Sequence, residues 1–375
     1  MRTLSIVLGL LVLMVGCRQP APDLEGDLPT EEIRPGPVKF IPLGVLGDPA
    51  TETSQAFAVS EDGRFVVGSN FVENGPQEAF RWSAESGMIG LGFVPDLTGS
   101  GANGVSSDGS VVVGISFSRA GETAFRWTSS SGMQMLPQGG DPVVPSFALD
   151  VSADGGSIVG AANTATGHHA FLWTAAAGFR DLGVISGSTG TSEGQSVSGD
   201  GSVVVGISTD ASQQDFAFRW TAAQGMVALQ PLPGATDGSN GGGVSVDGTV
   251  AVGNSNFSTS QGLLPRATLW GSDGSPVDLG TLPGGGASQA TAVSADGARV
   301  VGFASNASGD GEAFVWDAEN GLRRLWDVLA QAGAGKGLVG WSLTSAADIT
   351  PDGHTIVGVG TNPKGRQEAW LAAIP

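Results

Sequence analysis

The side chains that could carry acid–base or metal chemistry are few in this chain, and their spacing is unfavourable. His168 and His169 are adjacent in a polar segment, and the third histidine, His354, follows a turn. Adjacent residues of an extended strand point to opposite faces, so His168 and His169 would make a poor pair of metal ligands. We expect all three histidines to be solvated loop residues.

The other reactive residue types narrow the choice of enzyme class further. The chain has one cysteine and no tyrosine, so a covalent nucleophile would have to be serine, threonine or a carboxylate. It contains no Gly-x-Ser-x-Gly elbow, phosphate-binding loop or His-Glu-x-x-His zinc motif. The sequence therefore predicts no catalytic residue, no cofactor and no metal site.

Two alternatives stay open. The segment from Asn306 to Asp310 loosely resembles a calcium-binding loop whose twelfth position would be Asp317, although its first and third positions carry no carboxylate. A glycan-active hydrolase or lyase would need two carboxyl groups about 5 to 10 Å apart, for example from Glu73, Glu122 or Asp210.

Aspartate also recurs in a repeated Val-Ser-x-Asp-Gly turn, at intervals of 46 to 56 residues. A turn aspartate commonly accepts hydrogen bonds from nearby backbone N–H groups, and a glycine after it can adopt a positive φ angle. We therefore expect these carboxylates to hold a tight hairpin rather than calcium. The seven turn aspartates are Asp62, Asp108, Asp154, Asp200, Asp247, Asp296 and Asp352.

The elements that must position these residues belong to one repeated unit, best seen from Gly104 to Leu136. Val-Val-Gly after the turn predicts a second strand, and Ala-Phe-Arg-Trp places Phe125 and Trp127 on one face of a third. Met133 to Leu136 predicts a fourth strand. A glycine six residues after each turn aspartate is expected to close strand two. Each unit is thus a four-stranded antiparallel meander.

Seven units of this length predict a seven-bladed β-propeller over residues 38–375, an all-β fold. The Phe and Trp of strand three are expected to form the core between blades. The segment Val38 to Gly44 resembles a fourth strand with no unit before it, while the last unit ends after its third strand. We therefore expect the N-terminal strand to complete the last blade, at an outer edge where Pro42 is tolerated.

An insertion between the sixth and seventh units runs from Trp326 to Trp341. Asp327 as N-cap and Gly333 after the C-cap predict one or two helical turns on the face of the long loops between strands two and three. An open alternative is that this insertion contacts a partner protein while the ring itself is inert.

Residues 1–16 form a predicted secretory signal, with Arg2 followed by an apolar segment too short to span a membrane. The run Leu13-Met14-Val15-Gly16-Cys17 resembles the lipobox of bacterial lipoproteins, which implies lipidation of Cys17 and a membrane anchor. Residues 17–37 are rich in proline and acidic residues and predict an extended tether. Ordinary secretion with a free thiol is the alternative. Arg18 favours the outer membrane or cell surface.

The repeats resemble the HAF repeats of bacterial extracellular proteins, with the triplet itself at His169-Ala170-Phe171. The similarity covers Phe40 to Pro375, and Ile349 to Gly353 is similar to the turn of TolB-like propellers. The resemblance implies an extracytoplasmic propeller and transfers no reaction. The net charge of −19 disfavours nucleic acid and direct binding to anionic lipid. We expect a monomer whose only membrane contact is the lipid on Cys17.

Propellers display their variation on the loops around the channel, so ligand-binding residues are sought there. Aromatic and polar side chains suit a glycan, another polysaccharide or an extended peptide. We expect a non-catalytic binding or scaffold module of the cell envelope. Its candidate ligand-binding residues are Phe71, Asn74, Phe117, Arg119, His168, Asp210, Asn256, Phe257, Asp310 and Arg366.

Overall fold

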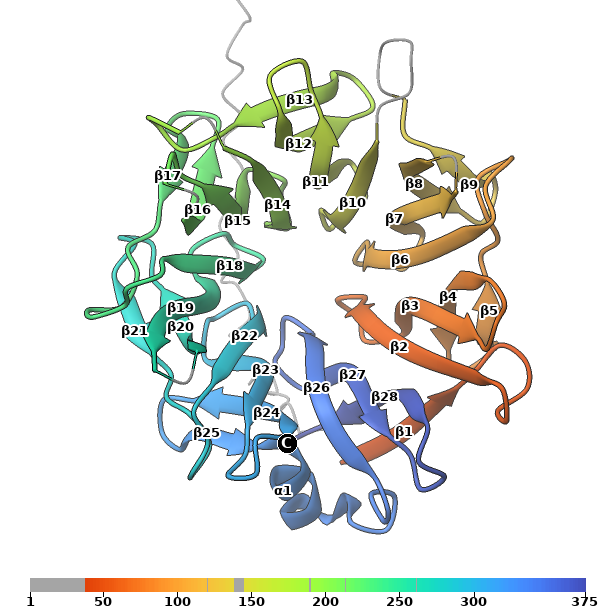
Figure 1. Ribbon diagram of the computed structural model, residues 1–375. Helices are drawn as coiled ribbons and strands as arrows, with labels where there is room; N and C mark the ends of the chain where they lie inside the picture. The colour runs from red at the N-terminus through yellow and green to blue at the C-terminus, as the bar shows by residue number, and fades with distance from the viewer. Residues whose placement is uncertain (1–37, 120, 138–144, 189, 213, 261) are drawn as a thin grey trace, which may run out of the picture. The chain divides into compact units, whose positions relative to one another are not determined.

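A computed structural model describes residues 38–375 except 120, 138–144, 189, 213 and 261. The predicted signal, tether and lipidation site at residues 1–37 lie outside the described residues. The described chain forms seven four-stranded antiparallel sheets. Figure 1 shows these sheets arranged around a central axis. The predicted seven-bladed propeller is confirmed.

The first four blades each take four consecutive strands, from the axis outward. Blade 1 contains β2 (Glu52–Val59), β3 (Phe65–Val72), β4 (Gln77–Ser83) and β5 (Gly87–Gly90). Blade 2 contains β6 (Gly99–Val105), β7 (Val111–Ser118), β8 (Gly121–Thr128) and β9 (Gly132–Met135). Blade 3 contains β10 (Ser146–Val151), β11 (Ser157–Asn163), β12 (His168–Thr174) and β13 (Gly178–Gly183). Blade 4 contains β14 (Ser192–Val197), β15 (Val203–Thr209), β16 (Asp215–Thr221) and β17 (Gly225–Ala228).

The last three blades include the closing strand. Blade 5 contains β18 (Ser239–Val244), β19 (Ala251–Thr259), β20 (Gly262–Trp270) and β21 (Pro276–Asp278). Blade 6 contains β22 (Ser288–Val293), β23 (Arg299–Ser305), β24 (Gly311–Asp317) and β25 (Gly321–Arg324). Blade 7 contains β26 (Ser342–Ile349), β27 (Thr355–Thr361), β28 (Gln367–Ala373) and β1 (Lys39–Gly44).

Strand β1 closes the ring as predicted. It pairs antiparallel with β28, with Pro42 opposite Trp370, and forms the outer edge of blade 7. Leu43 is buried in a cluster that also contains Phe80 and Leu371, so the closing strand contacts blade 1 as well as its own sheet. The beginning and end of the propeller are thereby joined through both hydrogen bonds and apolar packing.

The strand-three aromatic residues form the core between blades, as predicted. Phe125 packs with Val67 and Ala79 of blade 1, whereas its neighbour Ala124 packs with Ala148 of blade 3. Strand three is therefore buried on both faces, and its alternation separates contacts to the two neighbouring blades. Burying one large apolar side chain contributes roughly 1.5 to 3 kcal/mol, so these clusters hold the ring together.

The glycine six residues after each turn aspartate does not close strand two, contrary to our prediction. Gly68 lies inside β3, opposite a β-bulge between Ala56 and Ala58 of β2. A Cβ atom at Gly68 would lie 1.9 Å from the carbonyl oxygen of Gln55, so no other residue fits. The same bulge and glycine recur in the other six blades. Each inner strand therefore turns one extra residue toward the axis.

The turn aspartates accept local hydrogen bonds, as predicted. Asp154 Oδ1 accepts bonds from the Ser152 hydroxyl at 2.7 Å and the Gly156 N–H at 2.8 Å. These bonds favour the carboxylate and lower the pKa of Asp154. Gly155 has φ 72°, which explains the glycine of the motif.

A second serine, eight residues before the turn aspartate, joins neighbouring blades and was not predicted. Ser100 Oγ accepts the N–H of Ala79 from blade 1 at 2.9 Å and donates to the carbonyl of Gly92 at 2.6 Å. Equivalent bonds from strand-three alanines to inner-strand serines occur at five other junctions. The signal was present in the sequence as Ser54, Ser100, Ser146, Ser192, Ser239 and Ser288.

The insertion forms the short helix α1 (Leu325–Leu329) and the π-helical turn η1 (Ala330–Ala334). Asp327 lies in the first turn, so its predicted N-cap role is wrong; Arg324 precedes the helix. Gly333 has φ 103°, in the left-handed region expected after a helix. A Cβ atom on Gly340 would lie 3.0 Å from Pro363, which places the insertion beside the β27–β28 loop as predicted. Within the described residues no helix has the length and apolarity to cross a bilayer.

Candidate functional site

Two of the candidate ligand-binding residues, Phe71 and Phe117, line one hollow between blades 1 and 2. The hollow measures about 390 Å³, and its other lining residues are Val72, Gly75, Pro76, Gln77 and Thr98. None of the seven carries a charge. We call this the aromatic hollow. It offers two half-buried rings together with an amide and a hydroxyl, which are groups that bind neutral ligands.

The repeat itself positions these two rings. Phe71 and Phe117 each follow their turn aspartate by nine residues, and each is the second-last residue of its strand, β3 or β7. Opposite Phe117 lies Gly99, where a Cβ atom would be 2.4 Å from the Phe117 ring, so the missing side chain leaves room for it. In the described chain neither ring is stacked on another aromatic residue. Both rings are half-buried, so part of each ring surface is accessible to a ligand.

Asn74 and Arg119 lie on the same two hairpins as the aromatic rings. Asn74 occupies the β3–β4 turn with φ 60°, and Arg119 follows β7; both are exposed and neither lines the hollow. They could contact only the part of a ligand that extends beyond it.

The remaining candidates belong to other blades and do not gather with the aromatic hollow. His168 Nδ1 is 2.9 Å from Asn163 Oδ1, and Asp210 accepts the N–H groups of Ser212 and Gln214. Asn256 is buried and donates to the carbonyl of Asp237, while Arg366 donates to the carbonyl of Ala50. Phe257 is half-buried in blade 5, and Asp310 is exposed in blade 6. His168 and Asp210 order their own hairpins, whereas Arg366 contacts the loop between β1 and β2.

The segment from Asn306 to Asp310 is a hairpin turn. Asn306 Oδ1 accepts the N–H groups of Ser308 and Asp310, and Asn306 Nδ2 donates to Glu312. Asp317, the expected twelfth ligand, ends β24 and contacts Arg323 instead. Over the described ranges no group of three or more histidine, cysteine or acidic side chains could hold a metal ion.

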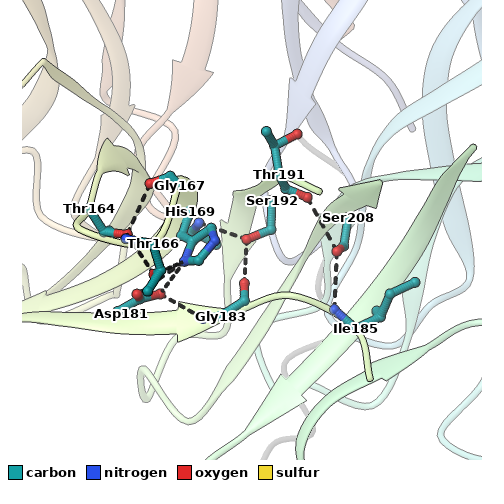
Figure 2. Close-up of polar contacts among 11 residues, drawn as sticks. Thr164, Thr166, Gly167, His169, Asp181, Gly183, Ile185, Thr191, Ser192 and Ser208 are labelled. Atoms are coloured by element: carbon teal, nitrogen blue, oxygen red, sulfur yellow. Dashed lines mark hydrogen bonds and ion pairs between the residues drawn. The ribbon is translucent and has the colours of Figure 1, made fainter. Parts of the chain in front are cut away.

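The prediction that the histidines lie in solvated loops was wrong for the adjacent pair. His168 and His169 both lie in β12, and His169 is only 5% exposed. His169 Nδ1 lies 3.0 Å from Asp181, which also accepts the N–H of Gly183 at 2.7 Å. Figure 2 shows the His169 and Asp181 side chains pointing toward each other. His354 is half-buried, with Nδ1 3.1 Å from the carbonyl oxygen of Ile374.

Ser192 lies near the His169–Asp181 pair, but these residues do not form a nucleophilic triad. Ser192 Oγ accepts the N–H of Ala170 at 2.9 Å and donates to the carbonyl of Gly183, so its hydrogen bonds go to the backbone (Figure 2). Other blades place a carboxylate in a similar role, since Glu78 accepts the N–H of Gly92. The His169–Asp181 pair therefore orders the edge of blade 3.

A second hollow, of about 190 Å³, lies on the propeller axis, on the side where the turns between the first and second strands of the blades lie. We call it the central hollow. Its titratable lining residues are Glu61, Asp150 and Asp348, and no lysine, arginine or histidine lines it. Burial raises the pKa of Asp150 to about 6 and that of Asp348 to about 7, against hydrogen bonds that favour the charged form. This site was not predicted from the sequence, although Asp150 and Asp348 stand at a repeat position that the other blades fill with small neutral residues.

The carboxylates considered for hydrolysis are spread over three blades. Glu73, Glu122 and Asp210 belong to blades 1, 2 and 4, and no hydrogen bond joins any two of them. Glu73 lies 4.0 Å from Arg366, and Asp210 holds its own turn. The carboxyl groups with raised pKa values lie in the central hollow, where both aspartates accept backbone N–H groups.

The comparisons with known proteins show the fold alone. No family model and no curated protein matches this chain, so the resemblance to HAF-repeat proteins stays a prediction. Among solved structures, an oligogalacturonate lyase from Vibrio parahaemolyticus is 10% identical with a TM-score of 0.57, covering 90% of this chain and 97% of that one. An oligogalacturonate lyase in complex with manganese is 14% identical, with a TM-score of 0.54 and coverage of 90% and 97%. A prolyl endopeptidase structure is 11% identical, with a TM-score of 0.53 and coverage of 84% and 48%.

Proposed function

We propose that this chain is a lipid-anchored, extracytoplasmic propeller that binds a neutral glycan without catalysing its cleavage. The observation that carries the proposal is the aromatic hollow, where Phe71 and Phe117 lie beside uncharged polar groups. Sugar rings present C–H groups that pack on aromatic faces, and their hydroxyls bond to amides and hydroxyls. The net charge of −19 favours a neutral polymer over a polyanion.

Binding is favoured over hydrolysis because the aromatic hollow lacks an acid or base. A glycosidase needs two carboxyl groups flanking the scissile bond, and none of the seven lining residues has one. The raised-pKa aspartates lie at the other end of the strands and bond to backbone N–H groups. An extended peptide is the second ligand class that the aromatic hollow could accept.

Replacing both rings, Phe71→Ala with Phe117→Ala, should lower retention on the polysaccharide or peptidoglycan that captures the parent protein by at least tenfold. That loss corresponds to about 1.4 kcal/mol, within reach of one or two lost aromatic contacts. The matched control is Phe303→Ala, which removes a half-buried phenylalanine from blade 6. Equal retention of the double variant and the control would contradict the proposal, and retention on peptides alone would replace the glycan with a peptide.

The anchor is tested at Cys17. Cys17→Ser should move the protein from the membrane fraction to the soluble fraction and abolish labelling with radioactive palmitate, because the chain has no other cysteine to acylate. Labelling of the Cys17→Ser variant, or a parent protein that is soluble and unlabelled, would remove the lipid anchor from the proposal and leave ordinary secretion.

A further inference from the structure

A third hollow, of about 260 Å³, lies between blades 2 and 3. The start of β8, the end of β9 and the segments before β6 and β10 line it. Like the aromatic hollow, it therefore lies at the hairpins between second and third strands. Most of its lining side chains are apolar, and one is charged. We call it the apolar hollow, formed by Val94, Pro95, Leu97, Met135 and Pro145 together with Glu122.

The apolar hollow adjoins the aromatic hollow. Leu97 lines the apolar hollow, and the next residue, Thr98, lines the aromatic hollow. Glu122 of the apolar hollow lies opposite Phe117 of the aromatic hollow in the pairing of β7 with β8. The shared segment is fixed to β7, because the Thr98 N–H donates to the Phe117 carbonyl at 3.0 Å. A polymer bound at the aromatic hollow therefore has the apolar hollow within reach.

Glu122 is a hydrogen-bond acceptor without a donor. It is exposed, and its carboxylate makes no hydrogen bond or ion pair with any other described residue. An ionised carboxylate only accepts hydrogen bonds, so Glu122 is available to an N–H or O–H group of a ligand. The polar side chains at the same register position of four other blades all have side-chain partners; they are Gln77, His168, Asp215 and Gln367.

An acetamido group fits this arrangement better than a hydroxyl or an ammonium group. Its N–H can donate to Glu122 while its methyl group covers Leu97 and Met135, of which Met135 is 38% exposed. A hydroxyl can donate to the carboxylate but leaves the apolar side chains uncovered. An ammonium group can pair with the carboxylate, but it loses hydration beside apolar side chains.

Building on the proposed function, we propose that the glycan bound at the aromatic hollow contains N-acetylated amino sugars. Phe71 and Phe117 contact the ring of one sugar unit, and the apolar hollow receives the acetamido group of a neighbouring unit. Glu122 and Met135 then select this substituent. The ligand class is a neutral polymer with acetamido groups rather than a polymer of unsubstituted hexoses.

The test is calorimetric titration of the full chain with tetramers of N-acetylglucosamine, glucose and glucosamine that share one linkage. The three ligands carry an acetamido, a hydroxyl or an ammonium group at the same carbon. The acetamido tetramer should bind about tenfold more tightly than the glucose tetramer, because it adds a hydrogen bond to a charged acceptor and buries a methyl group.

Glu122→Ala and Met135→Ala should each weaken binding of the acetamido tetramer by about threefold or more and leave binding of the glucose tetramer unchanged. Both side chains are exposed, so their removal leaves the core intact. The control is Val227→Ala, which removes an exposed apolar side chain from the outer strand β17 and should keep the preference of the parent.

Equal binding of the acetamido and glucose tetramers would overturn this inference and leave the binding of a neutral glycan standing. Tightest binding of the glucosamine tetramer would also overturn it, because Glu122 would then select a positive charge. Failure of the proposed function has a different signature: the Phe71→Ala, Phe117→Ala double variant binds every tetramer as the parent does. If no tetramer binds, the acetamido assignment fails, and retention of the parent on other polysaccharides decides the proposed function separately.

Discussion

Deleting residues 38–44 should open the ring and destabilise the propeller by on the order of 5 kcal/mol, because it removes the buried Leu43 and the half-buried Phe40 and Ile41 from apolar contacts. The deletion removes all of β1, which pairs with β28 and packs against blade 1 through Leu43. It also leaves Ser54 without the Gly44 carbonyl to which it donates at 2.6 Å. Thermal unfolding and limited proteolysis measure the loss.

The control for this deletion removes the same number of residues from the preceding acidic segment, for example residues 24–30. That change leaves β1 intact and should preserve both the melting temperature and protease resistance. If the 38–44 deletion melts and resists protease as the parent does, β1 does not close the ring.

Replacing Trp370 by alanine should cost about 3 to 5 kcal/mol, because it leaves a large cavity in the last blade. Trp370 is fully buried in a cluster with Leu343 and Ala346, and Phe40 of the closing strand packs against it at a ring distance of 6.3 Å. The loss is measured as the free energy of unfolding in urea.

The matched variant Trp370→Phe should stay within about 1 kcal/mol of the parent. Phenylalanine occupies this position in five other blades, for example at Phe125 opposite Gly114. The Trp370 indole N–H is buried without a hydrogen-bond partner in the described chain, so its removal offsets part of the lost packing. A large loss for both variants would show that the tryptophan shape itself is required.

The sequence predicted the repeat, the seven blades, the aromatic core and the closing strand because each depends on local periodicity repeated along the chain. The turn aspartates were assigned correctly for the same reason: Asp154 and its partners lie within two residues of each other. Pro42 at the edge of blade 7 followed from its missing N–H group.

Features that depend on contacts between blades could not be predicted from one unit. The repeated glycine at Gly68 was counted correctly but given the wrong role, because its reason is the carbonyl of Gln55 across a bulge. β12 begins at His168, so His169 lies inside the strand rather than in the loop before it, and its side chain is buried. Asp150 and Asp348 acquire raised pKa values only when seven inner strands enclose a common hollow.

Among the ligand candidates, only those placed at the same repeat position in adjacent blades came together. Phe71 and Phe117 meet that condition, whereas the polar candidates of blades 3 to 7 were chosen by residue type alone and mostly order their own loops.

The most direct test of the proposed function is a calorimetric titration of the full chain with the neutral polysaccharide that retains it, followed by analysis of the same samples for shortened chains. We expect saturable binding by the parent, at least tenfold weaker binding by the Phe71→Ala, Phe117→Ala double variant, and intact polysaccharide in both. Equal affinity of parent and double variant, or shortened chains in the parent sample, would contradict it.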